Sequence, residues 1–121
     1  MEKAFEADLR IVGALHRAGI AVVAGTDQTI PGYSLHREIE LYVQAGFTPM
    51  EAIQAATIVP ARVMGLDREV GTVEPGKRAD VIVLSANPLD DIRNTRKVEY
   101  VITNGVISNS ADLWRSVGFQ P

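Results

Sequence analysis

The sequence predicts an α/β fragment, in which helices pack around one buried strand, followed by a smaller segment of short antiparallel strands. Three observations support this fold class. Residues 3–18 repeat apolar side chains at helical spacing, residues 20–24 form an unbroken apolar run, and short strand-like runs with tight turns begin at Gly71. The change in pattern divides the chain into an α/β segment, residues 1–68, and a sheet segment with a short C-terminal helix, residues 69–121.

The first part of the chain reads as helix, strand and loop. The first helix is expected to stop at Gly19, which is a common helix terminator. Residues 20–24 are apolar and rich in β-branched side chains, as in a parallel strand that is covered on both faces. Residues 25–33 are predicted to form a loop, because Pro31-Gly32 marks a turn. The apolar positions of the first helix are Phe5, Leu9, Val12 and Leu15.

Two more helices are predicted from their start signals. Ser34 can cap a helix that runs to about Ala45. In Thr48-Pro49-Met50-Glu51, the threonine caps the next helix, the proline takes its first position, and the glutamate completes a capping box. Pro60 is expected to interrupt that helix, and a short further turn follows it.

The last part of the chain is predicted to form an antiparallel sheet. Glu74-Pro75-Gly76-Lys77 has proline and glycine where a type II turn requires them. Residues 79–84 read as a buried strand, and residues 98–103 alternate as a second strand. Asn104-Gly105 is a strong hairpin signal and leads into a third strand.

Composition and charge narrow the function classes. The chain has 121 residues, of which 46% are hydrophobic and 22% charged, as in a globular domain. Its net charge of -3 does not favour a nucleic-acid or membrane partner. No apolar run approaches the roughly 18 residues of a membrane span. The sequence has no cysteine, which excludes thiolate chemistry and fits the cytoplasmic location that we expect.

Asp27 is the residue most directly tied to chemistry. It follows the apolar run in Ala24-Gly25-Thr26-Asp27, so its carboxylate is predicted to lie at the C-terminal tip of a strand. Barrel enzymes present metal ligands and general bases in this way. A catalytic metal needs about three protein ligands. This chain has two histidines, His16 and His36, and no His-x-His pair. We therefore expect no metal at Asp27 in this chain alone.

Four blocks of the chain, in this order and spacing, resemble the metal-dependent amidohydrolase superfamily. The resemblance extends from about Phe5 to Ile107 and is nearest to the imidazolonepropionase and Xaa-Pro dipeptidase-like branches. The blocks are Ala24-Gly25-Thr26-Asp27, Leu35-His36-Arg37-Glu38-Ile39-Glu40-Leu41, residues 48–57 and residues 71–80.

The resemblance implies a distorted (β/α)₈ barrel that carries a divalent metal, usually zinc, and a small β-sandwich. This chain is similar to the last helix–strand–helix unit of the barrel and the C-terminal sandwich strands. Asp27 matches the catalytic aspartate, which binds metal or takes the proton of the attacking water during cleavage of amide or cyclic C–N bonds. The family's His-x-His, its bridging lysine and two later histidines have no counterpart here.

The two histidines have different expected roles. In the context of the resemblance, His36 could contact substrate, because it lies in the first turn of a helix beside the 25–33 loop. A surface or capping role is the alternative for His36. His16 lies near a helix C-terminus, where partial positive charge is favourable, so a structural role is expected.

Three interpretations of the function remain open. The chain is the C-terminal part of an amidohydrolase and inactive alone, or a free-standing non-catalytic binding or oligomeric assembly module, or a small hydrolase completed across subunits. In each case, apolar surface on residues 20–24 and 81–84 needs a cover. We therefore expect a homo-oligomer, most simply a dimer, or a missing N-terminal portion as partner.

Overall fold

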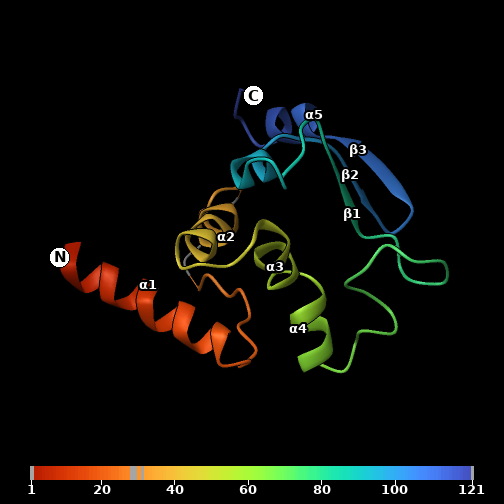
Figure 1. Cartoon of the computed structure of the whole chain (residues 1–121). Coiled ribbons are helices and arrows are strands. Elements are labelled where there is room, and N and C mark those ends of the chain that lie inside the picture. The colour runs from red at the N-terminus through yellow and green to blue at the C-terminus, as the bar shows by residue number, and fades with distance from the viewer. Residues whose placement is uncertain (1, 28–29, 31, 121) are drawn as a thin grey trace.

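The computed structural model describes residues 2–27, 30 and 32–120. In Figure 1, helices α1 to α4 lie together, the sheet and α5 lie at the opposite end, and η1 lies between α2 and the sheet. The turn predicted at Pro31 falls partly outside the described residues. The elements are α1 (Glu2–Arg17), α2 (Ser34–Gln44), α3 (Pro49–Gln54), α4 (Ile58–Val63), β1 (Val81–Leu84), the 3-10 helix η1 (Ile92–Arg96), β2 (Val98–Thr103), β3 (Val106–Asn109) and α5 (Ser110–Ser116).

The core lies where α2 meets the start of α3, with contributions from α1 and η1. Phe47, between α2 and α3, is 5% exposed and stacks on Tyr42 and on His16, with ring centroids 5.1 Å and 3.7 Å away. The Nε2 of His16 also lies 3.4 Å from Glu51. The structural role expected for His16 is therefore confirmed. The buried core residues are Ile39, Tyr42, Ala45, Phe47, Ala52, Ala55 and Ile92.

A glycine allows α1 to approach the end of α2 closely. Gly13 is buried, and a Cβ atom at this position would lie 2.1 Å from the carbonyl oxygen of Ala45. Backbone in that position cannot move as freely as the tip of a side chain. Any larger residue at position 13 would therefore push the two helices apart.

The helix starts confirm one predicted cap and correct another. The capping box of α3 is confirmed, because Thr48 accepts from the backbone N–H of Glu51 and its own N–H donates to the Glu51 carboxylate. The cap at Ser34 is wrong. Ser34 is the first helical residue, and its hydroxyl accepts from the N–H of Ile30 at 3.2 Å instead. The loop backbone offers this donor next to the helix start.

Pro60 does not interrupt a helix as predicted. The break comes earlier, at residues 55–57, and Pro60 is the third residue of α4. Proline is tolerated there because the N–H groups of the first helical turn have no partner within the helix.

The buried strand predicted at residues 20–24 is wrong for this structure. These residues are not assigned to any strand, and Ile20 and Val23 are 52% and 39% exposed. Asp27 therefore does not lie at a strand tip. The physical reason is that a strand needs a hydrogen-bonded neighbour. Among the described residues, the N–H groups of this segment make one bond back to the end of α1, from Ile20 to Leu15, and one from Ala24 to Ala55.

The antiparallel sheet is confirmed, in the order β1-β2-β3. The Asn104-Gly105 turn joins β2 to β3 with φ values of 50° and 75°, as a type I′ turn requires. The turn at residues 74–77 is also confirmed, with Gly76 at φ 88°.

The strand predicted at residues 79–84 is shorter and less buried than expected. It begins at Val81, and Ile82 and Val83 are 47% and 39% exposed. β1 is an edge strand, and the described part of the chain provides no second sheet to cover both of its faces. None of the helices described here combines the length and apolar character that crossing a membrane requires.

Candidate functional site

Asp27 lies at the end of residues 20–27, which are not assigned to any strand. It is exposed and has a φ of 42°, a left-handed conformation that aspartate adopts more readily than most residues. Within residues 2–27, 30 and 32–120, no group of three or more His, Cys, Asp or Glu could hold a metal ion. The residues present therefore do not fit a catalytic zinc, which needs about three protein ligands. No metal-dependent step can be assigned to this chain alone.

Hydrogen bonds hold residues 23–25 against the helices that follow. The N–H of Ala24 donates to the carbonyl of Ala55 at 2.9 Å. The N–H of Gly25 donates to Glu38 Oε1 at 3.0 Å, and the hydroxyl of Tyr42 donates to the same oxygen at 2.5 Å. These contacts bring the segment before Asp27 onto one side of α2.

The side chains of Tyr42 and Glu38 affect each other through their hydrogen bond. Burial, followed by the hydrogen bond to Glu38 and its charge, raises the pKa of the Tyr42 hydroxyl above its usual value. The second oxygen of Glu38, Oε2, is buried and has no hydrogen-bond partner among the described residues. A buried carboxylate oxygen without a partner lowers the stability of the folded chain, and such oxygens are rare in native structures.

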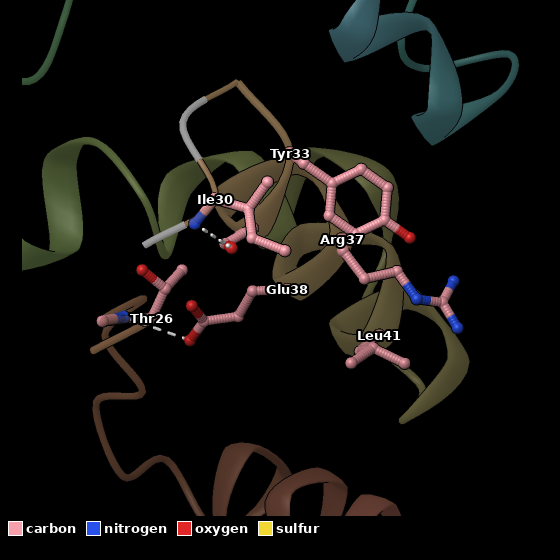
Figure 2. A pocket seen from close by; sticks show the side chains of 8 residues that line it. Thr26, Ile30, Tyr33, Arg37, Glu38 and Leu41 are labelled. Atoms are coloured by element: carbon pink, nitrogen blue, oxygen red, sulfur yellow. Dashed lines mark hydrogen bonds between the residues drawn. The ribbon is translucent and has the colours of Figure 1, made fainter. Parts of the chain in front are cut away.

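A hollow of about 360 Å³ opens beside Glu38. Figure 2 shows Thr26 and Ile30 on one side of it and the α2 side chains of Glu38 and Leu41 on the other. Its volume is within the range of about 300–1,000 Å³ that is usual for ligand sites. The full lining consists of Gly25, Thr26, Ile30, Tyr33, Ser34, Arg37, Glu38 and Leu41.

His36 lies on a different side of α2, facing η1. Its Nδ1 is 3.1 Å from the hydroxyl oxygen of Thr95, and that hydroxyl donates to the carbonyl of Ile92 at 2.9 Å. Because the hydroxyl proton is already used, Nδ1 is the donor and Nε2 is left as an acceptor in the neutral ring. Burial, and then the nearby charge of Arg96, lower the pKa of His36, although the charge of Glu40 opposes this shift.

The structure therefore does not bring the two predicted site residues together in one hollow. His36 is not among the residues that line the hollow beside Thr26. It lines a second one of about 350 Å³, together with Arg96 and Trp114. Substrate contact by His36 stays a prediction.

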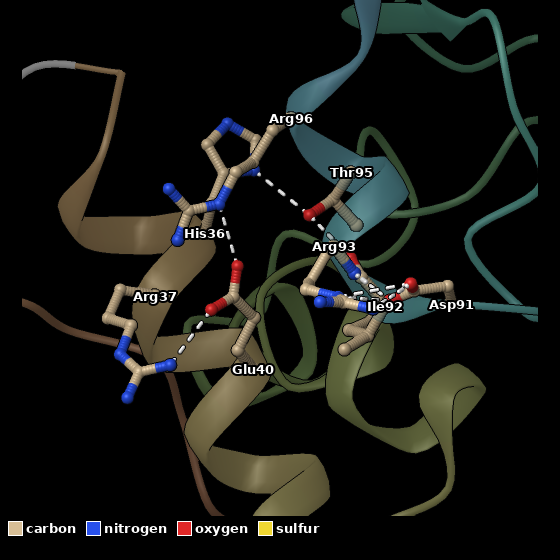
Figure 3. A network of polar contacts seen from close by, with 8 residues as sticks. All are labelled: His36, Arg37, Glu40, Asp91, Ile92, Arg93, Thr95 and Arg96. Atoms are coloured by element: carbon tan, nitrogen blue, oxygen red, sulfur yellow. Dashed lines mark hydrogen bonds and ion pairs between the residues drawn. The ribbon is translucent and has the colours of Figure 1, made fainter.

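A polar network next to His36 joins α2 to η1, as Figure 3 shows. Glu40 is only 6% exposed, and its carboxylate accepts from Arg37 at 3.0 Å and from Arg96 at 2.7 Å. Burial by itself would raise the pKa of Glu40, but the hydrogen bonds from Arg96 and Arg37 reverse this and lower it. The guanidinium of Arg96 also lies 4.6 Å from the ring centroid of Tyr33, a cation–π contact.

The sequence interpretation missed Glu38, Glu40 and Tyr42. The spacing of four residues between Glu38 and Tyr42 is the one local signal, because such residues are neighbours on a helix surface. Nothing in the sequence near Glu40 indicates its partner Arg96, which follows 56 residues later.

The sequence model of the amidohydrolase family matches residues 5–108. This chain belongs to the amidohydrolase family. It is 42% identical over 73 residues to an adenine deaminase from Paracoccus denitrificans. The aligned part covers 60% of this chain and 11% of that protein. The family membership inferred from the four sequence blocks is thereby confirmed.

Solved structures extend the comparison to the fold. A Xaa-Pro dipeptidase with bound methionine in its active site is similar with a TM-score of 0.76 and 28% identity, over 84% of this chain and 25% of that chain. A prolidase-like protein from Bifidobacterium longum has a TM-score of 0.73 and 44% identity, over 80% of this chain and 25% of that chain. The helices and the three-stranded sheet match the C-terminal part of such structures. This chain spans about a quarter of their length.

Proposed function

We propose that this chain is the C-terminal part of a metal-dependent amidohydrolase that cleaves an amide or cyclic C–N bond. The observation that carries the proposal is the family match over residues 5–108, combined with coverage of only 25% of the similar solved chains. Deaminases, dipeptidases and prolidases all break C–N bonds, which supports the reaction class. The barrel and sandwich context of the chain is part of the same proposal.

In the proposed enzyme, this chain supplies the catalytic carboxylate. Asp27 accepts the proton of the attacking water and returns it to the leaving nitrogen, which is general acid–base chemistry by one group. His36 is proposed as a substrate contact. A divalent metal, zinc by the family resemblance, belongs to the complete enzyme, and the rest of its ligands come from residues outside this chain.

Because it lacks those ligands, the chain is proposed to be inactive alone. The test is a chimera in which this chain replaces the matching C-terminal part of the prolidase-like protein from Bifidobacterium longum, to which it is 44% identical. We expect the chimera to bind a divalent metal and hydrolyse Xaa-Pro dipeptides, whereas the 121-residue chain does neither. Metal content and release of proline are the measurements.

Asp27→Asn in the chimera is the matched control. We expect it to lower kcat by a factor of at least about 10², the lower range for loss of a general acid–base group. Full activity of the Asp27→Asn chimera would contradict the role of Asp27. Stoichiometric metal or turnover in the chain alone would contradict its proposed inactivity.

The alternative is a free-standing binding or assembly module, and one observation favours it. Many large apolar side chains are exposed, which is typical of a surface that another chain covers. We propose that in this alternative a second copy covers them, in a homodimer, whereas in the longer enzyme proposed above the N-terminal portion covers them. Light scattering tests the dimer, and a 13.1 kDa monomer that is stable at micromolar concentration would contradict it. The most exposed examples are Val63, Met64, Val73, Ile107 and Val117.

A further inference from the structure

The carboxylate of Glu38 occupies the point where α2 meets the segment that ends in Asp27. Glu38 Oε1 accepts both from the backbone N–H of Gly25, at 3.0 Å, and from the hydroxyl of Tyr42, at 2.5 Å. The Tyr42 oxygen also lies 3.3 Å from the carbonyl oxygen of Val23. Two side chains of one helix thus contact the backbone two and four residues before Asp27.

This contact matters because the segment has little else to hold it. Residues 20–27 are not assigned to any strand, and the N–H of Ala24 makes the other backbone bond near its end. Asp27 then adopts a left-handed φ of 42°. The direction in which the chain leaves Gly25 therefore decides where the Asp27 carboxylate lies.

We propose that Glu38 is a positioning residue that sets the place of Asp27 by holding the Gly25 amide, while Tyr42 fixes the orientation of the Glu38 carboxylate. The inference rests on the proposed function, because the place of Asp27 affects catalysis only if Asp27 takes part in the reaction.

Comparison with Glu40 separates this role from general stabilisation. Glu40 lies on the same helix, and both of its oxygens are paired with arginines. Glu38 instead keeps Oε2 buried and without a partner among the described residues, next to the hollow that Thr26 lines. An arrangement that costs stability is more typical of functional sites than of structural ones.

The first experiment measures amide hydrogen exchange in the ¹⁵N-labelled 121-residue chain by nuclear magnetic resonance. Glu38→Ala is expected to speed exchange of the Gly25 amide at least about tenfold, since it removes a hydrogen bond to a charged acceptor. Glu38→Gln keeps an acceptor oxygen and is expected to restore most of the protection. The control Glu40→Gln is expected to change Gly25 exchange less than about twofold.

The second measurement follows the Tyr42 hydroxyl by its ultraviolet absorbance at alkaline pH, with Tyr42→Phe to identify its signal. Glu38→Gln is expected to lower the pKa of Tyr42 toward its usual value, because the negative charge of Glu38 is removed. Glu40→Gln is expected to leave the titration unchanged. If Glu38→Ala does not fold, this titration still tests the contact between Glu38 and Tyr42, and an unchanged titration in Glu38→Gln overturns the inference.

The third measurement uses the chimera with the prolidase-like protein. Glu38→Ala is expected to lower kcat about tenfold with KM within about twofold, and Glu38→Gln to recover most of the kcat, whereas Glu40→Gln leaves both near the unmodified chimera. Unchanged Gly25 exchange in a folded Glu38→Ala variant overturns the inference. So does an unchanged kcat, which leaves the proposed function intact. An unmodified chimera that folds without activity overturns the proposed function and this inference with it.

Discussion

The two sides of α2 meet very different surroundings. Toward η1, Glu40 has both oxygens paired with arginines and His36 is paired with Thr95. Toward the N-terminal segment, Glu38 has one oxygen without a partner among the described residues, and Val23 beside it is 39% exposed. On the first side, the polar side chains of Glu40 and His36 find their hydrogen-bond partners within the chain. The second side faces the segment that ends in Asp27, the proposed catalytic residue.

The largest expected effect tests the satisfied side. Glu40→Ala leaves Arg37 and Arg96 without their carboxylate, which we expect to lower the free energy of unfolding by about 2–3 kcal/mol. Removing one partner of a fully buried pair costs about 3–5 kcal/mol, and the Arg96 side chain here is 33% exposed. Urea unfolding followed by circular dichroism measures the change. Glu99→Ala, at an exposed strand position, is the control and should stay within about 0.5 kcal/mol.

The next effect tests how closely the N-terminal side is packed. Gly13→Ala should raise helix propensity by about 1 kcal/mol, yet the added Cβ meets the carbonyl of Ala45. We expect the clash to dominate, because overpacking typically costs about 1–3 kcal/mol. The net result is a less stable protein by about 1–2 kcal/mol in urea unfolding. A more stable Gly13→Ala variant would mean that α1 does not rest on the end of α2.

A smaller effect tests the backbone at the proposed catalytic residue. Asp27 has a φ of 42°, which glycine adopts without strain and alanine does not. We expect Asp27→Ala to lower the free energy of unfolding by about 0.5–1 kcal/mol and Asp27→Gly to leave it nearly unchanged. Equal effects of the two substitutions would contradict the left-handed conformation.

The smallest effect is a pH dependence on the satisfied side. Since the pKa of His36 is lowered in the folded state, the unfolded chain binds that proton more readily. The contribution of neutral His36 is complete above its unfolded value near 6.5 and is lost as the pH falls below it. Between pH 6.5 and about pH 5, the free energy of unfolding should fall more in the unmodified chain than in His36→Asn. Parallel pH profiles would contradict the burial of His36 against η1.

What the sequence could predict depends on the distance between the interacting residues. The capping box at Thr48 and Glu51 and the hairpin at Asn104-Gly105 are local, and both were predictable from the chain alone. The strand at residues 20–24 required parallel neighbours, and none lies beside it in the described residues. The pattern was therefore interpreted correctly as apolar but wrongly as paired.

In the candidate site, too, local features could be predicted from the sequence and contacts between distant residues could not. Asp27 is predicted as a site residue from its place in a short motif, but the Glu38–Gly25 contact joins residues 13 positions apart through a side chain. No periodicity indicates which of the two glutamates of α2, Glu38 or Glu40, turns toward a backbone amide. The location of His36 against Thr95, 59 residues later, required the position of η1, a helix that the sequence interpretation did not include.

The contact between Trp114 and Gly32 gives the chain a built-in optical reporter. Trp114 is the only tryptophan, and its ring lies so close to Gly32 that a Cβ there would be 2.3 Å from it. It also meets Phe119 edge-on at 5.5 Å. Its fluorescence is therefore expected to change when α5 separates from the start of α2, and to stay unchanged when α1 alone detaches. If the two ends of the molecule unfold one after the other, the unfolding curves from fluorescence emission and from circular dichroism will not coincide.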